Sequence, residues 1–184
     1  RLLEKELNPD RFLKKTNNGN NEIYLVSEMD SPNVVREIGR LREVTFRDAG
    51  GGTGEELDLD SFDKGEYAFK QLVLWDPNDK ELIGGYRFIY CEHLEIDKDG
   101  SIKSPTASLF KYSRTFIKDY FPFTIELGRS FVQPLYQPTF NLRRGMYALD
   151  NLWDGIGAVI VDNPEIKYLF GKVTMYPHFD TLAR

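Results

Sequence analysis

Two strand-like segments joined by a short turn constrain this chain more than any other feature of its sequence. Residues 67–75 and 81–90 are rich in aromatic and branched apolar side chains, and Asp76-Pro77-Asn78-Asp79-Lys80 lies between them. Proline, asparagine and aspartate in so short a connection are typical of a hairpin turn. The sequence therefore predicts an antiparallel strand pair.

The other segments alternate between helix-like and strand-like patterns. Helices are predicted at 1–7, at 32–46 after a Ser31 cap, at 109–120 after a Ser108 cap, and at about 144–161. Further strands are predicted at 22–27, 123–132 and 166–175. This order of elements predicts an α/β (α+β) domain with a mixed, largely antiparallel central sheet flanked by helices.

The chain divides into a short opening and one domain. Its 184 residues suit a single domain, since domains average about 150 residues. Residues 1–21, an N-terminal helix and a polar linker, are interpreted as peripheral, and residues 22–184 as the domain. Because the sequence begins at Arg1 without an initiator methionine, we expect it to be a fragment of a longer protein.

The composition argues against several classes of protein. A net charge of -5 and a pI near 5.2 disfavour nucleic-acid binding, which usually needs a strongly basic face. Cys91 is the single cysteine, and His93 and His178 are the two histidines, so we expect no internal disulfide and no metal site. No apolar run approaches the roughly 20 residues of a membrane-spanning helix. We expect a cytoplasmic protein.

Three short motifs lack residues that their chemistry needs. Gly50–Gly54 is not followed by the lysine and the serine or threonine that end a nucleotide-binding loop, and we interpret it as a mobile surface loop. Asp97–Gly100 has its glycine at the fourth rather than the sixth position of a calcium loop, which indicates a plain turn. Gly128-Arg129-Ser130 lacks the glycine pattern of a nucleophile elbow.

Charged residues inside the apolar segment 123–132 are more informative. Strand alternation places Glu126 on a different sheet face from Ile125 and Leu127. Their three-residue spacing would also separate Glu126 from Arg129, unless a bulge at Gly128 returns both side chains to one face. From spacing alone, a solvated strand face with scattered ion pairs is an equally good interpretation.

Four motifs in a fixed order carry a resemblance to a known family. They are Arg42-Glu43-Val44-Thr45-Phe46, Asp60-Ser61-Phe62-Asp63, Gly84-Gly85-Tyr86-Arg87 and Glu126-Leu127-Gly128-Arg129. In this order they resemble the pattern shared by acyl-homoserine lactone synthases and the ornithine-lipid, or hemolysin-like, amino-acid N-acyltransferases, both in the GNAT superfamily. Three later segments are similar to the second, lipoamino-acid branch: Arg143-Arg144-Gly145, Leu152–Ile156 and Tyr168–Gly171.

The resemblance implies the chemistry of an acyl transfer. The donor would be a fatty acyl group, including a 3-hydroxy acyl group, held as a thioester on phosphopantetheine, and the acceptor a small amino acid such as ornithine or glycine. The superfamily's pyrophosphate loop is not cleanly present near Arg143, which favours acyl carrier protein over coenzyme A. No permanently bound cofactor is expected, and a lipid product would allow peripheral contact with a membrane.

The resemblance also implies roles for individual residues. Glu126 would be the catalytic base, and backbone amides of Ser130, Phe131 and Val132 would stabilise the oxyanion. Two basic clusters, Arg143 with Arg144 and Lys111 with Arg114 and Lys118, would attract the acidic carrier; a solvated face without a partner is the alternative interpretation. The acceptor site or a purely structural charge network would be formed by Arg42, Phe46, Asp60, Asp63, Arg87 and Arg129. Three arginines against two aspartates would leave an excess of positive charge for an anionic acceptor.

Two other functions remain open at this stage. One is lactone synthesis from S-adenosylmethionine, although the tryptophan that lactone synthases carry after their first motif is missing from Phe46–Ala49. The other is a non-catalytic module that binds an acyl chain or an amino acid on the same fold. Turnover of a thioester distinguishes the enzyme from the binding module.

Overall fold

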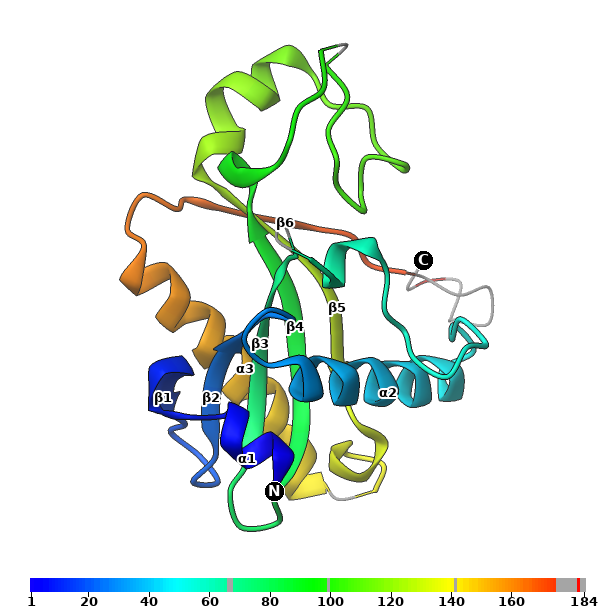
Figure 1. The fold of residues 1–184 in the computed structure, drawn as a ribbon, viewed down its shortest axis with the longest axis vertical. Coiled ribbons are helices and arrows are strands. Elements are labelled where there is room, and N and C mark those ends of the chain that lie inside the picture. The colour runs from blue at the N-terminus through cyan, green and yellow to red at the C-terminus, as the bar shows by residue number, and fades with distance from the viewer. Residues whose placement is uncertain (66–67, 99, 141, 175–181, 183–184) are drawn as a thin grey trace.

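A six-stranded sheet formed by the described residues is the framework of the protein (Figure 1). The computed structural model describes residues 1–65, 68–98, 100–140, 142–174 and 182, without the side chains of Arg143 and Arg144. The strands, in spatial order, are β1 (Phe12–Lys15), β2 (Glu22–Val26), β3 (Lys70–Asp76), β4 (Glu81–Tyr90), β5 (Thr124–Val132) and β6 (Tyr168–Gly171). Neighbours are antiparallel except β5 and β6, which are parallel. The predicted mixed, largely antiparallel sheet is confirmed.

Helices cover both faces of the sheet. The α-helices are α1 (Leu2–Glu6), α2 (Pro32–Asp48) and α3 (Leu142–Asp162). Shorter helical turns are η1 (Pro9–Arg11), η2 (Ser61–Asp63), η3 (Cys91–His93), η4 (Phe116–Tyr120), η5 (Phe121–Phe123) and η6 (Pro134–Tyr136). In Figure 1, α2 crosses in front of the strands and α3 lies behind them. Within the described residues, no helix combines the length and apolar composition needed to cross a bilayer.

The central strand β3 shows why the sheet sits between two helical layers. Leu72 and Leu74 pack in the cluster that contains Leu152 and Ile156 of α3. Val73 packs with the apolar stripe of α2 on the opposite face. Because successive strand side chains alternate between faces, the continuous apolar run Leu72–Trp75 must be covered on both sides of the sheet.

The opening of the chain contributes a strand to the sheet. Strand β1 pairs with β2 at one edge, and residues 16–21 form the loop between them. The sequence did not predict this strand because Phe12–Lys15 has only four residues, two of them lysines. Pairing along one edge, rather than an apolar pattern, determines its conformation.

The helix predicted at 109–120 is wrong over its first half. The described helical residues begin only at Arg114, and η4 has π-helical geometry. The preceding residues form turns instead, because the backbone N–H groups of Leu109 and Phe110 both donate to the carbonyl oxygen of Thr106. Ser113 rather than Ser108 caps the helix, since its Oγ accepts from the Phe116 N–H at 3.1 Å.

Two other predicted segments differ from the structure in smaller ways. The strand predicted at 166–175 is shorter, since β6 ends at Gly171, and Met175 lies outside the described residues. The glycine-rich loop after α2 is anchored by the buried Glu43 carboxylate, which accepts from the N–H groups of Thr53 at 2.8 Å and Gly54 at 3.0 Å. Such contacts fix one end of a loop that its glycine content predicted to be mobile.

Candidate active site on strands β4 and β5

Strand β5 contains a bulge opposite Tyr86 of β4. Gly128 pairs with Arg87 and Phe131 pairs with Gly85, so that Arg129 and Ser130 together face one residue. Arg129 has a φ of 49°, in the left-handed region that residues with a side chain rarely adopt. A bulge is present as predicted, but Arg129 rather than Gly128 adopts the unusual conformation.

Beyond the bulge, β5 loses its partner on the β6 side. Strand β6 pairs with β5 from Thr124 to Leu127 and reaches Gly171 at the end of this pairing. Among the described strands, none continues along β5 from Gly128 to Val132 on that side. Within the described part of the chain, the bulged half of β5 is therefore a sheet edge, at which backbone N–H and C=O groups can pair with an extended ligand.

Glu126 is a buried carboxylate just before this edge. Its residue is 3% exposed, and its Oε2 accepts a hydrogen bond from Ser104 Oγ at 2.7 Å. Burial raises the pKa of Glu126, while hydrogen bonds from Ser104 and Thr106 and the charge of Arg87 partly offset the rise. A carboxylate with a raised pKa can take up and release a proton nearer to neutral pH than an exposed glutamate.

Two predicted site arginines are enclosed in a charge network. Arg42 is 0% exposed and donates to both carboxylate oxygens of Asp63, at 3.1 and 2.8 Å. Arg87 is 2% exposed and donates to Asp60 at 2.6 Å and to Asp63 at 2.8 Å. Gln71 Nε2 adds a third donor to Asp63 at 2.8 Å. Arg42 and Arg87 are thus enclosed by the carboxylates of the protein itself.

Arg129 forms the more accessible side of the same network. Its Nε lies 3.0 Å from Asp58 Oδ2, and its NH2 lies 3.5 Å from Asp60 Oδ2. The side chains of Arg129 and Asp60 are 31% and 33% exposed. Arg87 lies on the same sheet face as Glu126, because Arg87 pairs with Gly128 two residues along β5. Both Arg87 and Arg129 contact Asp60, so the bulge does return Glu126 and Arg129 to one face.

Asp58 also belongs to this network, although no local sequence pattern assigned it there. Asp58 is 2% exposed, and its backbone carbonyl oxygen accepts from Arg42 Nε at 3.1 Å. Its carboxylate also pairs with Arg42 and Arg129. Three arginines therefore meet three aspartates, and the excess of positive charge expected from two aspartates is corrected to a balance. The available signal was the position of Asp58, two residues before Asp60 in the acidic segment formed by residues 55–63.

Sequence reasoning also missed Ser104 and Thr106. Both are buried, at 6% and 3% exposure, and their hydroxyl groups lie 2.8 Å apart beside Glu126. The Tyr112 hydroxyl contacts Thr106 Oγ1 and extends the chain of hydroxyl groups toward an aromatic cluster with Phe116 and Phe121. Ser104 and Thr106 precede Glu126 by 20 or more positions in the sequence, so no local pattern predicts their contacts with it.

The remaining predicted residues occupy varied positions. Ser130 is exposed, Phe131 is buried beneath α2, and Val132 packs toward α3. Phe46 packs against the apolar core on the α2 side of the sheet, rather than in the charge network near β4. The side chains of Arg143 and Arg144 lie outside the described part of the chain. Among the described residues, no group of three or more His, Cys, Asp or Glu is placed to hold a metal ion.

This chain is similar to a known protein family and to two curated proteins. The family described as "Acetyltransferase (GNAT) domain" matches residues 41–144, which include the charge network, Glu126 and the bulge. The chain is 49% identical over 183 residues to a glycine N(alpha)-acyltransferase of Phocaeicola vulgatus and 50% identical to one of Bacteroides thetaiotaomicron. Both matches cover 100% of this chain but 56% and 54% of the relatives, so the chain spans about half the length of the curated relatives it matches.

A solved structure is similar at a lower level. An aminoglycoside acetyltransferase from an uncultured soil metagenomic sample aligns with a TM-score of 0.47 and 12% identity, over 86% of this chain and 83% of that chain. The family match, in contrast, extends over more than half of the present sequence and includes the residues that converge on β4 and β5. The chain belongs to the GNAT acetyltransferase family.

Proposed function

We propose that this chain is the N-acyltransferase domain of an enzyme that makes lipoamino acids. It would transfer a fatty acyl group, including a 3-hydroxy acyl group, from a phosphopantetheine thioester to the amine of a small amino acid. The observation that carries the proposal is Glu126, a buried carboxylate with a raised pKa beside the bulged, half-unpaired strand β5. The names of both relatives make glycine the first candidate acceptor, and ornithine the second from the resemblance of the motifs.

Glu126 suits the proton transfer that this reaction requires. An amino-acid amine is mostly protonated at neutral pH and must lose a proton before it can attack. In the proposed reaction, Glu126 accepts that proton, and the amine nitrogen forms a bond to the thioester carbonyl carbon. The C–S bond then breaks, the nitrogen loses its second proton to become the amide, and the leaving phosphopantetheine thiolate takes up that proton.

The free edge of β5 suits the donor. Phosphopantetheine is an extended chain with amide groups, which can pair with an unpaired strand edge. We place it along Ser130, Phe131 and Val132, where a backbone N–H can also stabilise the oxyanion of the attacked carbonyl. A bulge supports this role because it interrupts the regular hydrogen-bonding ladder.

Arg129 is the preferred contact for the acceptor carboxylate. It is the partly exposed arginine of the network, whereas Arg42 and Arg87 are enclosed. Its guanidinium group can bind a carboxylate while it retains its contact with Asp58. Because the network is balanced in charge, this preference rests on the exposure of Arg129 rather than on an excess of positive charge.

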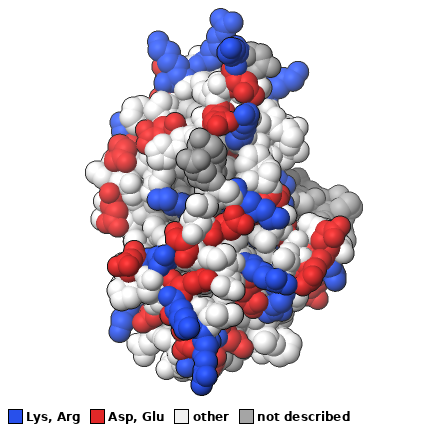
Figure 2. Space-filling model, in the orientation of Figure 1, with Lys and Arg blue, Asp and Glu red and all other residues white. Residues whose placement is uncertain are grey.

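Acyl carrier protein is the proposed carrier of the donor. Figure 2 shows Lys and Arg side chains at the top of the molecule, where the segment between β4 and β5 projects above the sheet in Figure 1. Lys111, Arg114 and Lys118 of this segment are exposed. Acyl carrier protein is strongly acidic, so an exposed basic surface would speed their association. The proposal keeps Arg143 and Arg144 as a second contact.

An assay with defined donors and acceptors tests the function. The protein is incubated with acyl carrier protein or coenzyme A carrying the same acyl chain, and with glycine, ornithine or glycinamide. Mass spectrometry should detect N-acylglycine, formed faster from the carrier-protein donor, and little product from glycinamide. Binding of the acyl thioester without turnover would instead indicate a binding module, and a lactone formed from S-adenosylmethionine would indicate a lactone synthase.

A further inference from the structure

A chain of three hydroxyl groups runs from Glu126 into the segment between β4 and β5. Ser104 Oγ lies 2.7 Å from Glu126 Oε2 and 2.8 Å from Thr106 Oγ1. Thr106 Oγ1 in turn contacts the Tyr112 hydroxyl. Ser104 and Thr106 are 6% and 3% exposed, and Tyr112 is half-buried. The contacts nearest to Glu126 are therefore largely shielded from water, where a hydrogen bond is electrostatically stronger than at an exposed site.

The ionised form of Glu126 determines the direction of every hydrogen bond in this chain. A carboxylate only accepts, so Ser104 must donate its single hydroxyl proton to Glu126. Ser104 Oγ then accepts from the backbone N–H of Thr106 at 3.1 Å and from the Thr106 hydroxyl. Thr106 has no further proton to give, so the Tyr112 hydroxyl donates to Thr106. Each bond polarises the next toward the carboxylate, and the chain as a whole stabilises the ionised form.

The residues at both ends of the chain are held by their own surroundings. The backbone carbonyl oxygen of Ser104 accepts from the Ala107 N–H at 3.1 Å, which closes a turn. The Tyr112 ring stacks on Phe116 with 5.6 Å between the ring centroids. Such support matters, because a base is effective only when it is held within hydrogen-bond reach of the proton that it removes.

We infer that Ser104, Thr106 and Tyr112 are positioning residues for the proposed base. Through Ser104 they hold Oε2 of Glu126, so that Oε1 is the oxygen that accepts the proton of the acceptor amine. They act through Glu126 and do not touch the substrate. The inference rests on the proposed function for its effect on the rate, whereas its effect on the titration of Glu126 can be measured without a substrate.

The other groups around Glu126 keep their charge over the range in which this carboxyl titrates. Among the described residues, Arg87 of β4, Cys91 of η3 and Tyr112 interact electrostatically with Glu126. Burial raises the pKa of Cys91 to about 12 and also raises the pKa of Tyr112. Phe170 of β6, which pairs with Glu126, is uncharged. A titration between about pH 4 and 9 at this position therefore belongs to Glu126.

Carbon-13 NMR of the Glu126 carboxyl in the 184-residue chain tests the inference, with the signal assigned by its loss in Glu126→Gln. Ser104→Ala should move the titration midpoint upward by about one pH unit or more, as for loss of a hydrogen bond to a charged group. Thr106→Val should also move it upward, because Ser104 loses the donor that polarises it. Ser104→Thr keeps a hydroxyl and should restore the midpoint. Ser108→Ala is the matched control, since Ser108 Oγ bonds to the Pro105 carbonyl oxygen instead.

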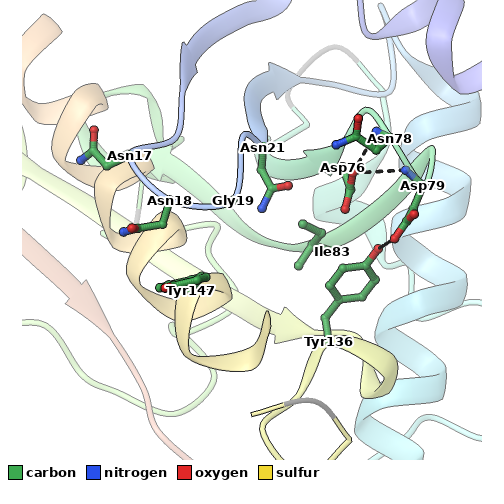
Figure 3. A pocket seen from close by; sticks show the side chains of 10 residues that line it. All are labelled: Asn17, Asn18, Gly19, Asn21, Asp76, Asn78, Asp79, Ile83, Tyr136 and Tyr147. Atoms are coloured by element: carbon green, nitrogen blue, oxygen red, sulfur yellow. Dashed lines mark hydrogen bonds between the residues drawn. The ribbon is translucent and has the colours of Figure 1, made fainter. Parts of the chain in front are cut away.

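Tyr112→Phe tests the outer end of the chain against a remote tyrosine. It removes the last donor and should give a smaller upward shift. Tyr136→Phe is the matched control, because the Tyr136 hydroxyl bonds to Asp79 in the wall of a polar cavity (Figure 3). Ile83 lines this cavity, six residues along β4 from the partner of Glu126, which is about 20 Å of extended strand. The control should leave the midpoint unchanged.

Acyl-transfer kinetics separate positioning from a merely structural role. On the acid limb of the pH profile, Ser104→Ala should lower kcat about tenfold, which corresponds to a midpoint about one pH unit higher, with little change in the KM for glycine. Ser104→Thr should recover the rate.

The outcomes distinguish this inference from the proposed function. An unchanged midpoint in folded Ser104→Ala and Thr106→Val would overturn the inference, and so would a lower kcat with an unshifted pH profile. Absence of acyl transfer by the wild-type chain would contradict the proposed function instead. The NMR midpoints alone would then decide whether the hydroxyl chain controls Glu126.

Discussion

Two buried carboxylates near β4 have pKa values that are shifted in opposite directions. Burial raises the pKa of the Glu126 carboxyl more than its hydrogen bonds lower it, because the donors are neutral hydroxyl and amide groups. Burial acts in the same direction at Asp63, but hydrogen bonds and charges from Arg42 and Arg87 outweigh it and lower the pKa to about 2. Asp63 is therefore a permanent anion of the structure, while Glu126 can exchange a proton.

Glu126→Gln should lower acyl transfer about a hundredfold, the usual scale for a positioned base. The wild-type rate should rise with pH through a pKa above the ordinary value of 4.5, and the variant should lack this rise. Glu92→Gln on the surface is a matched control with unchanged rate. Wild-type turnover of the Glu126 variant from about pH 6 to 9 would remove Glu126 as the base.

Glu126→Gln should also keep or increase stability at neutral pH. A carboxyl whose pKa is raised by folding stabilises the protein while protonated, and that contribution is lost as pH rises through the folded pKa. Glutamine stays neutral and can still accept from Ser104. Urea unfolding at pH 5 and pH 8 should show a relative gain for the variant at the higher pH. A clear loss at pH 8 would indicate that the buried charge itself stabilises the fold.

Asp63→Asn should destabilise the protein by about 3–5 kcal/mol, because it leaves Arg42 and Arg87 buried without their shared counter-charge. Asp60→Asn, at a site 33% exposed, should cost less. Since the pKa of Asp63 is lowered from 3.8 to about 2, its contribution is fully present above the unfolded value and is lost as pH falls through that interval. Acid titration of unfolding should show this loss in the wild type and not in the Asp63 variant.

Arg129→Gly should raise the KM for glycine at least about tenfold, the cost of losing one charged hydrogen bond. Glycine tolerates the positive φ at this position, so the change separates binding from backbone strain. Arg129→Lys retains the charge and should have an intermediate KM. An unchanged KM in folded Arg129→Gly protein would show that Arg129 does not contact the acceptor carboxylate.

Among the elements of the sheet, β4 lies too close to β5 at Gly84 and to β3 at Gly85 for a side chain at either position. A Cβ at Gly84 would lie 2.3 Å from the carbonyl oxygen of Phe131, and one at Gly85 would lie 2.5 Å from that of Leu72. Both contacts are to backbone atoms, which cannot rotate away. The paired glycines allow β4 to lie between β3 and β5 at the position where β5 changes register.

Gly84→Ala should therefore destabilise the protein by about 2 kcal/mol or more, in the range of overpacked cores, and lower acyl transfer by displacing the bulge. Gly157→Ala in α3 is the matched control, since its Cβ would meet no atom within 4 Å. That control should gain about 0.5–1 kcal/mol from helix propensity. Thermal unfolding and the acyl-transfer rate should be measured for both variants. Equal stability and equal rates for Gly84→Ala and Gly157→Ala would contradict this role of the glycines.

In the whole molecule, residues 104–118 between β4 and β5 contain three basic and no acidic side chains, and they lie close to Glu126 because residues 104 and 106 contact that carboxylate. The outer surface of this segment carries Lys111, Arg114 and Lys118, in a chain whose net charge is -5. A carrier protein docked there would bring its acyl thioester close to Glu126, rather than to the far end of the sheet.

Reversal of Lys111, Arg114 and Lys118 to glutamate should raise the apparent KM for acyl carrier protein and weaken its dependence on salt. Rates with acyl-coenzyme A should change little, which separates docking from chemistry. Reversal of Lys5 and Lys15 near the N-terminus is the control. Unaltered kinetics with the carrier would move the docking surface to Arg143 and Arg144, where the same reversal can be made.

Local sequence patterns were sufficient to predict the layers of the fold. Apolar and turn residues predicted the β3–β4 hairpin, and apolar periodicity predicted α2 and α3. Strand alternation also predicted that the Glu126 side chain lies on the opposite sheet face from Ile125 and Leu127. In the structure, Ile125 packs in the cluster on the α3 side, while Glu126 contacts Ser104. These features depend on local propensity and on burial of one face, both of which are written in neighbouring residues.

Tertiary structure alone decided which polar groups meet. Strand β1 exists because β2 offers an edge, and the turns at 104–113 replace a predicted helix because their backbone and hydroxyl groups bond to one another beside Glu126. Asp58 balances the network because α2, the acidic segment and β5 converge there. Contacts between residues far apart in sequence leave no periodic signal, since hydrogen bonds and ion pairs depend on distances that only the complete fold establishes.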